Sequence, residues 1–239
     1  EDGALLLSQK CYFPVLRTIP NNTHATFCFS IPQEDRPMFI VDGKAVIEYP
    51  CKFVLDGTLK AICETNKGFK TERCFFPASD SKYCMERGKG KAETDIDIRL
   101  SHPAEYVHSY GRGTKGVYIC RIQHNAPESI SLKAGEESTF DIGYSAHIAN
   151  ENATLPNGNE EHKKRLQRIT ELCDNALVLK TGNAELDVMT RFAKLRAGES
   201  IFQTITGKYH SPGGHAYYAA TWCNDEIEYA GPHFAMTGD

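Results

Sequence analysis

The chain has 239 residues, of which 41% are hydrophobic and 24% charged, and these proportions are typical of a globular protein and exclude a disordered one. Its net charge is −4, and its basic residues are scattered among acidic ones, so we expect no nucleic-acid partner. No apolar run approaches the roughly 20 residues of a membrane helix, and we therefore expect no membrane contact.

Residues 10–148 have the pattern of an antiparallel β-sandwich, in which short apolar segments are separated by turn residues. Asp56-Gly57 predicts a two-residue type I′ hairpin, because both residue types tolerate positive φ angles. Residues 134–136 predict a turn, and the basic run 87–91 is interpreted as a solvated loop. The expected strands are 27–31, 38–41, 52–55, 58–63, 73–76, 95–100, 116–122, 129–132 and 138–145, within a sandwich domain that comprises residues 1–148.

The hydrophobic period changes after residue 148. Residues 149–159 are polar, include Pro156 and Gly158, and predict a linker. Residues 160–179 predict a helix with acidic residues at its positive N-terminal end. The apolar face of this helix follows three- and four-residue spacing and comprises Leu166, Ile169, Leu172, Cys173, Ala176 and Leu177.

A second helix is predicted at residues 184–197, where Asn183 can cap the N-terminus and Gly198 ends the helix. Its apolar face comprises Leu186, Met189, Phe192 and Ala193. Residues 199–206 predict a third stretch of helical or mixed structure. Residues 160–239 are therefore expected to form a helical segment that cannot close a domain of its own, as the start of a larger helical domain that continues beyond residue 239.

The nine cysteines form no C-x-x-C pair, and their odd number argues for reduced, mostly buried thiols. This usage favours a reducing compartment such as the cytoplasm. The alternative is a secreted or periplasmic chain from which a signal peptide was removed, because residue 1 is Glu and not Met.

Three short patterns resemble functional motifs, but the residues around them or their spacing do not support that function. Residues 111–116 match G-x-G-x-x-G, but a strand rather than a helix follows them, so they predict a hairpin loop. Residues 143–147 lack the final glycine of a nucleophile elbow. Four further residues are spaced unlike any metal-ligand motif, and we expect neither a metal nor a cofactor: His210, His215, Cys223 and His233.

Residues 209–232, which read YHSPGGHAYYAATWCNDEIEYAGP, concentrate aromatic and acidic side chains. They include Trp222, the only tryptophan of the chain, three residues before Asp225. Aromatic faces can stack on a sugar ring and carboxylates can accept hydrogen bonds from its hydroxyl groups, so the stretch indicates a carbohydrate site. On a helix, Asp225 would share a face with Glu228 and Tyr229. The alternative is that Trp222 is a core residue and the acids are ordinary surface groups.

Five elements in this order resemble the start of the catalytic domain of six-hairpin glycosidases: G-x-S at 198–200, Y-H-S-P-G-G at 209–214, Y-Y at 217–218, W-x-N-D at 222–225 and Y-x-x-P at 229–232. Residues 73–77 also look like the R-x-x-F-P strand of the sandwich in these proteins. In that superfamily a β-sandwich precedes an (α/α)6 barrel. The resemblance therefore implies an antiparallel β-sandwich followed by amphipathic helices that begin an incomplete (α/α)6 barrel.

By this resemblance, Asp225 would bind the sugar in the subsite of the cleaved bond, with Trp222 and Tyr218 stacking beside it. Asn224 occupies a position that is often arginine in the family, which leaves the identity of the sugar open. The family usually inverts the anomeric centre, and its acid and base generally come from later helices, so the catalytic residues are unassigned. The remaining candidates for a catalytic carboxylate within the chain are Glu226 and Glu228.

The expected function is that of a glycoside hydrolase fragment that contributes the β-sandwich and part of the sugar-binding subsite and is inactive alone. Its partner would be a glycan or oligosaccharide. Two alternatives stay open: a glycoside phosphorylase of the same architecture, and a non-catalytic carbohydrate-binding β-sandwich protein. The sequence leaves the sugar, the stereochemistry and the oligomeric state open.

Overall fold

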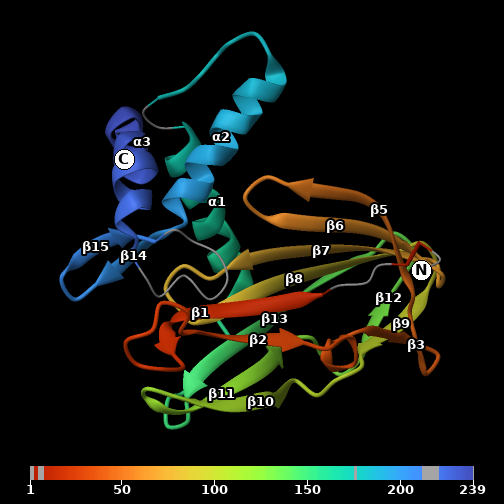
Figure 1. Cartoon of the computed structure of the whole chain (residues 1–239). Coiled ribbons are helices and arrows are strands. Elements are labelled where there is room, and N and C mark those ends of the chain that lie inside the picture. Colours follow the sequence, from red (N-terminus) through yellow and green to blue (C-terminus); the bar gives the residue numbers. More distant parts are fainter. Residues whose placement is uncertain (1–2, 5–7, 175–176, 212–220, 239) are drawn as a thin grey trace. The chain divides into compact units, whose positions relative to one another are not determined.

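A computed structural model describes residues 3–4, 8–174, 177–211 and 221–238 of the chain (Figure 1). The chain divides into two compact units. Unit 1 comprises Glu1–Cys11, Phe29–Gly111 and Gly116–Lys163, and unit 2 comprises Tyr12–Cys28, Arg112–Lys115 and Lys164–Asp239. The domain limits expected from the sequence stay a prediction. Within the described residues, no helix is both long and apolar enough to cross a lipid bilayer.

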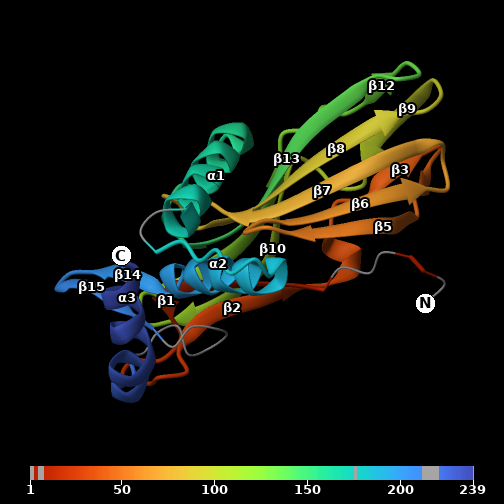
Figure 2. The same cartoon turned by 90° about the horizontal axis from the view of Figure 1, so that it is seen from above.

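Unit 1 contains a seven-stranded and a four-stranded sheet (Figures 1 and 2). The strands of the larger sheet are, in spatial order, β10 (Glu105–Gly113), β11 (Gly116–His124), β13 (Glu137–Ile148), β8 (Tyr83–Ala92), β7 (Phe69–Pro77), β6 (Leu59–Thr65) and β5 (Glu48–Leu55). The smaller sheet orders β12 (Ile130–Leu132), β9 (Ile96–Leu100), β3 (Phe39–Val41) and β4 (Lys44–Ala45). Strands β1 (Gln9–Arg17) and β2 (Thr26–Ile31) form a separate two-stranded sheet, and η1 (Gln33–Asp35) is a short 3-10 helix. The predicted antiparallel β-sandwich followed by helices is confirmed.

Aromatic side chains join the two sheets of unit 1. The ring of Phe39 in β3 lies edge-on to Phe69 in β7 at 5.4 Å and to Phe140 in β13 at 5.5 Å between centroids. Gly88 in β8 lies so close to Phe140 that a Cβ there would approach the ring to 2.6 Å. The core between the sheets therefore forms from residues that face inward on alternate positions of their strands.

The segment between β13 and the first helix lies over the outer face of the larger sheet. Leu155 packs against a buried cluster comprising Cys74, Phe76, Tyr83 and Met85. The backbone carbonyl of Ala153 accepts a hydrogen bond from the Gln123 side chain at 3.1 Å. The polar stretch predicted as a linker is thus anchored to the sheet through several side chains.

Two details of the hairpins differ from the sequence-based expectation. Asp56-Gly57 is not a two-residue type I′ turn: β5 and β6 pair Leu55 with Leu59, so three residues form the loop, and only Gly57 has a positive φ angle. The two-residue turn with two positive φ angles lies at Asp42-Gly43, between β3 and β4. The basic run 87–91 is not a loop either, because it lies within β8.

Three buried charges and the partly buried Glu48 form a chain inside unit 1, called the charge chain below. Arg73 in β7 donates to Glu48 in β5 through Nε and Nη2 at 2.7–3.0 Å, and through Nη1 to Glu86 in β8. Arg36 donates to Glu86 at 3.1 Å, and the Tyr144 hydroxyl in β13 donates to it at 2.7 Å. Burial acts to raise the pKa of Glu86, but Arg73 and Arg36 outweigh burial and hold this pKa below its usual value. Glu86 therefore remains charged inside the core.

Unit 2 contains α2 (Ala184–Gly198) and the part of α1 (Gly158–Asp174) from Lys164 onward, and these two segments pair. Both predicted helices are confirmed, but the first ends at Asp174, and the following described residues, 177–180, are not helical. The core between the helices comprises Ile169, Leu172, Cys173 and Leu195. Gly198 permits this contact, because a Cβ at its position would overlap the Leu172 side chain. As predicted, the Asn183 side chain caps α2 by accepting from the backbone N–H groups of Glu185 and Leu186.

The apolar face predicted for α2 is wrong. The described structure leaves Leu186, Met189, Phe192 and Ala193 exposed and buries Lys194 and Leu195. The Lys194 ammonium donates to the backbone carbonyls of Cys173 and Leu177 at 3.0 Å each. The last turns of α2, rather than its whole length, therefore contact α1.

Residues 201–210 form a β-hairpin where the sequence indicated helical or mixed structure. Strands β14 (Ile201–Thr204) and β15 (Gly207–His210) pair antiparallel. Gly207 has a φ angle of 137°, which side-chain-bearing residues rarely adopt. The described C-terminal residues then form a π-helix, η3 (Asp225–Ala230), and α3 (Gly231–Thr237).

Glu86→Gln is expected to lower the free energy of unfolding at neutral pH by about 3–5 kcal/mol, because Arg36 and Arg73 would keep buried charges without their shared counter-charge. The folded-state pKa of Glu86 lies below the unfolded value of about 4.3. The stability contributed by ionised Glu86 is therefore complete above about pH 4.3 and is lost as the pH falls through the folded-state pKa. Urea unfolding across this pH range measures both effects.

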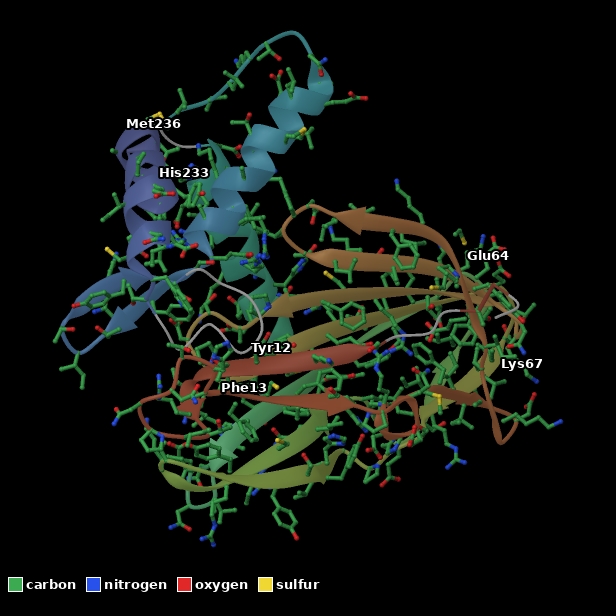
Figure 3. All side chains as sticks on the ribbon, in the orientation of Figure 1. Tyr12, Phe13, Glu64, Lys67, His233 and Met236 are labelled. Carbon is green, nitrogen blue, oxygen red and sulfur yellow. The ribbon has the colours of Figure 1, made fainter. Side chains whose placement is uncertain are left out.

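The control is Glu64→Gln, labelled at the β6–β7 end of the sheet in Figure 3, which removes an exposed partner of Lys70. An exposed pair contributes about 0–1 kcal/mol, so this variant should unfold almost as the wild type does. An equally small loss in Glu86→Gln would contradict the role assigned to the buried charges.

The cysteines should differ sharply in reactivity, since all nine are free thiols. Cys63 in β6 is buried, and burial, with a smaller effect of nearby Glu48, raises its pKa to about 11. Native alkylation at about pH 8 should label exposed Cys28, Cys51 and Cys223 within minutes and leave Cys63 unlabelled, because only an accessible thiolate reacts. Mass spectrometry of the labelled peptides measures this, and equal labelling of Cys63 would show that the β5–β6 edge opens.

Candidate functional site

The described residues of the stretch that the sequence singles out, residues 209–232, lie in β15, a helical turn, η3 and α3 of unit 2. Tyr209 and His210 end β15, residues 223–224 form a helical turn, and residues 225–232 lie in η3 and the start of α3. Tyr218 lies outside the described residues. The helix expected around Asp225 is present, but its geometry is that of a π-helix.

The π-helix changes which side chains share a face. The backbone N–H of Gly231 donates to the carbonyl of Glu226, five residues earlier, which marks a turn wider than that of an α-helix. In this wider turn, residues four and five apart align and residues three apart diverge. Asp225 therefore shares a face with Tyr229 but not with Glu228, contrary to the α-helical expectation. Single π-turns occur frequently at functional sites.

Glu226 and His210 form the best-defined polar contact of this region. Their Oε1 and Nδ1 atoms are 3.2 Å apart, and 31% and 15% of their side chains, respectively, remain exposed. The His210 ring also lies edge-on to Phe234 of α3, with 5.4 Å between centroids. These contacts hold β15 against η3 and α3. Of the two candidate carboxylates, the structure thus pairs Glu226 with a histidine and leaves Glu228 exposed.

Asp225 and Trp222 are both partly exposed. Asp225 is half-buried, and none of the described residues forms a hydrogen bond or ion pair with its carboxylate. Trp222 is 39% exposed, so it is not a core residue. Asn224 between them is exposed. The three residues therefore offer an aromatic surface, an amide and a carboxylate with spare acceptor capacity within one helical turn.

A cavity of about 420 Å³ lies in unit 2 beside the His210 side chain. Its walls combine two aromatic rings with one guanidinium, an amide, hydroxyl groups and an imidazole. Its lining residues are Pro14, Val15, Arg17, Phe202, Gln203, Thr204, Thr206, Tyr209, His210, Ser211 and Thr221. This size and mixture are typical of small-molecule sites. Thr221, which lines this cavity, directly precedes Trp222 in the chain, and Trp222 itself is not a lining residue.

Sequence reasoning missed most of the cavity. Three lining residues, Pro14, Val15 and Arg17, come from β1, which is far from residues 201–221 along the chain. No local sequence motif indicates that these two segments line one cavity. A signal existed for the hairpin, because residues 201–206 are rich in β-branched residues that favour strands. The candidate site residues themselves stay predictions.

Comparison with known proteins gives one weak structural similarity and no similarity in sequence. No protein-family model matches the sequence, and no curated protein is similar to it in sequence. Among solved structures, the chain is similar to one described as a "Putative kojibiose phosphorylase from human microbiome". The two are 10% identical with a TM-score of 0.34, and the match covers 80% of this chain and 32% of that chain. The link between the two structures is weak, and this chain spans about a third of the other.

The contact between His210 and Glu226 should order the C-terminal helices. His210→Ala removes this hydrogen bond and the contact with Phe234, so we expect a loss of about 1–2 kcal/mol in stability and faster amide hydrogen exchange in residues 225–237. Hydrogen-exchange mass spectrometry measures the local effect.

The matched control is His233→Ala, at a position labelled on α3 in Figure 3, which also removes a histidine ring next to Phe234 but keeps the bond to Glu226. Exchange that rises equally in both variants would show that the bond to Glu226 has no special ordering role.

Proposed function

We propose that this chain is part of a glycoside hydrolase and contributes the β-sandwich together with one wall of a sugar-binding subsite. The substrate class is a glycan or oligosaccharide. In this proposal Asp225 accepts hydrogen bonds from sugar hydroxyl groups, and Trp222 presents a flat apolar face to the C–H side of the ring. Asn224 and Tyr218 complete the same wall.

The observation that supports this proposal most directly is the half-buried carboxylate of Asp225, which has no partner among the described residues. A carboxylate accepts several hydrogen bonds, and those from hydroxyl groups to a charged acceptor are the stronger ones. An aromatic residue within the same turn supplies the stacking surface that sugars require. A structural aspartate at the end of a helix would instead be expected to cap the backbone or pair with a basic residue.

The aromatic and polar lining of the neighbouring cavity is consistent with the same ligand class. Phe202 and Tyr209 can face apolar sides of sugar rings, and Gln203 and Arg17 can donate to hydroxyl oxygens. Glu226, held by His210, is the better placed of the two carboxylates for a proton-transfer role, because its position is fixed by the histidine. Glu228 is the weaker candidate.

The mechanism proposed for the whole enzyme is inversion at the anomeric centre. An acid protonates the leaving oxygen while a carboxylate about 6.5–9.5 Å away activates water. We assign sugar binding to Asp225, Trp222 and Asn224, and among the described residues Glu226 is the candidate for one member of this pair. In an active longer form, product analysis with and without inorganic phosphate separates hydrolysis from phosphorolysis.

Sugar binding can be followed directly through Trp222, because it is the only tryptophan of the chain. Titration of the chain with oligosaccharides identified on a glycan array should change its fluorescence in a saturable manner. Asp225→Asn should weaken binding at least about tenfold, because hydrogen bonds to a charged group contribute about 1.5–3 kcal/mol.

Glu228→Gln is the matched control, since it removes an exposed carboxylate from the same π-helix and should leave affinity unchanged. The assignment of Asp225 would be abandoned if its asparagine variant bound as tightly as the wild type, or if no glycan altered the emission of Trp222.

A further inference from the structure

Unit 1 contains a cavity of about 280 Å³ whose walls include three members of the charge chain, Arg36, Glu48 and Arg73. Its lining residues are Ala4, Gln33, Arg36, Pro37, Met38, Ala45, Val46, Ile47, Glu48 and Arg73. None of them belongs to the proposed sugar site. Arg36 and Arg73 are each 3% exposed, so the guanidinium groups at this cavity are almost completely removed from bulk water.

The acceptors of this charge chain are already occupied by groups of the protein. Both carboxylate oxygens of Glu48 accept from Arg73, and one of them also accepts from the Thr71 hydroxyl. One oxygen of Glu86 accepts from Arg73, and the other accepts from Arg36 and Tyr144. Each carboxylate oxygen of the charge chain therefore already accepts at least one hydrogen bond from the protein.

The Arg36 guanidinium has more N–H donors than there are acceptor groups bonded to it. A guanidinium carries five N–H donors, and the only hydrogen bond of the Arg36 side chain to a described residue goes from Nη2 to Glu86. Its Nε is buried and has no acceptor among the described residues. An unsatisfied buried donor costs about 1–3 kcal/mol, so the Arg36 guanidinium is under-supplied with acceptors.

We propose that this cavity binds a small aliphatic carboxylate, with Arg36 as the residue that recognises it. A carboxylate only accepts hydrogen bonds, which suits a site with surplus donors, and its two oxygens match the planar fork of a guanidinium. Arg36 at present shares one carboxylate with Arg73, and Glu48 is neutralised by Arg73. The ligand carboxylate would give Arg36 a counter-charge of its own.

The remaining walls define the rest of the ligand. Pro37, Met38, Val46 and Ile47 are apolar and favour a hydrocarbon body rather than a ring bearing hydroxyl groups. The volume of about 280 Å³ accommodates a body of only a few carbon atoms. Gln33 adds one amide at the wall. A short branched or linear carboxylic acid anion fits this combination.

The test is calorimetric titration of the whole chain with 2-methylpropanoate, its neutral amide 2-methylpropanamide, and glucose. We expect saturable binding of the carboxylate, binding of the amide that is weaker by at least about tenfold, and no competition from glucose. Ala45→Trp should abolish carboxylate binding, because exposed Ala45 in β4 lines the cavity and a large ring there would occupy the space of the ligand while every residue of the charge chain is kept.

Lys44→Trp is the matched control: it places the same ring on the neighbouring, exposed position of β4, which points to the other side of the strand, and it should bind as the wild type does. Absence of carboxylate binding in the wild type overturns the proposal. Equal affinity for the amide, or undiminished binding in Ala45→Trp, does so as well.

Discussion

The charge chain from Arg36 through Glu86 and Arg73 to Glu48 is the constraint on which the architecture of unit 1 depends. It links β5, β7 and β8, and Tyr144 adds β13 through its hydroxyl. Buried charges are tolerated only when every partner is in place, so these residues penalise any other pairing of the strands. A shift of one residue in β7 would turn Arg73 to the opposite face, which would leave Glu48 without a cationic partner and Glu86 with Arg36 alone.

Much of the sandwich could be predicted because apolar and polar residues alternate along most of its strands. The strands that sequence reasoning did not find are informative. β8 reads YCMERGKGKA, and β10 contains four polar or charged residues and two glycines, so neither carries a strong apolar period. β8 is nevertheless central, because Glu86 is satisfied by arginines and Gly88 makes room for Phe140. Both contacts join residues that are far apart in the sequence, so a short stretch of sequence cannot predict them.

The candidate site also has a part that local sequence predicts and a part that depends on contacts between distant segments. Trp222 and Asp225 could be found from local composition, because a tryptophan and a carboxylate within four residues are an unusual pairing. The contact of His210 with Glu226 and the arrival of Arg17 at the cavity depend on how distant segments meet. The first helix was predicted too long because Leu177 continues its apolar period, although that residue follows the helix and is exposed. Periodicity records which residues are apolar but not which neighbour is available to cover them.

The π-helix at Asp225–Ala230 has a further consequence for how this region can change. A π-turn is equivalent to an α-helix that carries one additional residue, and α-helical hydrogen bonding is the more favourable state of the backbone. Loss of a single residue, such as exposed Ile227, would restore regular winding and rotate Asp225 by about 100° relative to α3. The orientation of the proposed sugar wall therefore depends on the one additional residue of this turn, which backbone stability alone disfavours. The number of residues in the turn determines the site as much as their identity does.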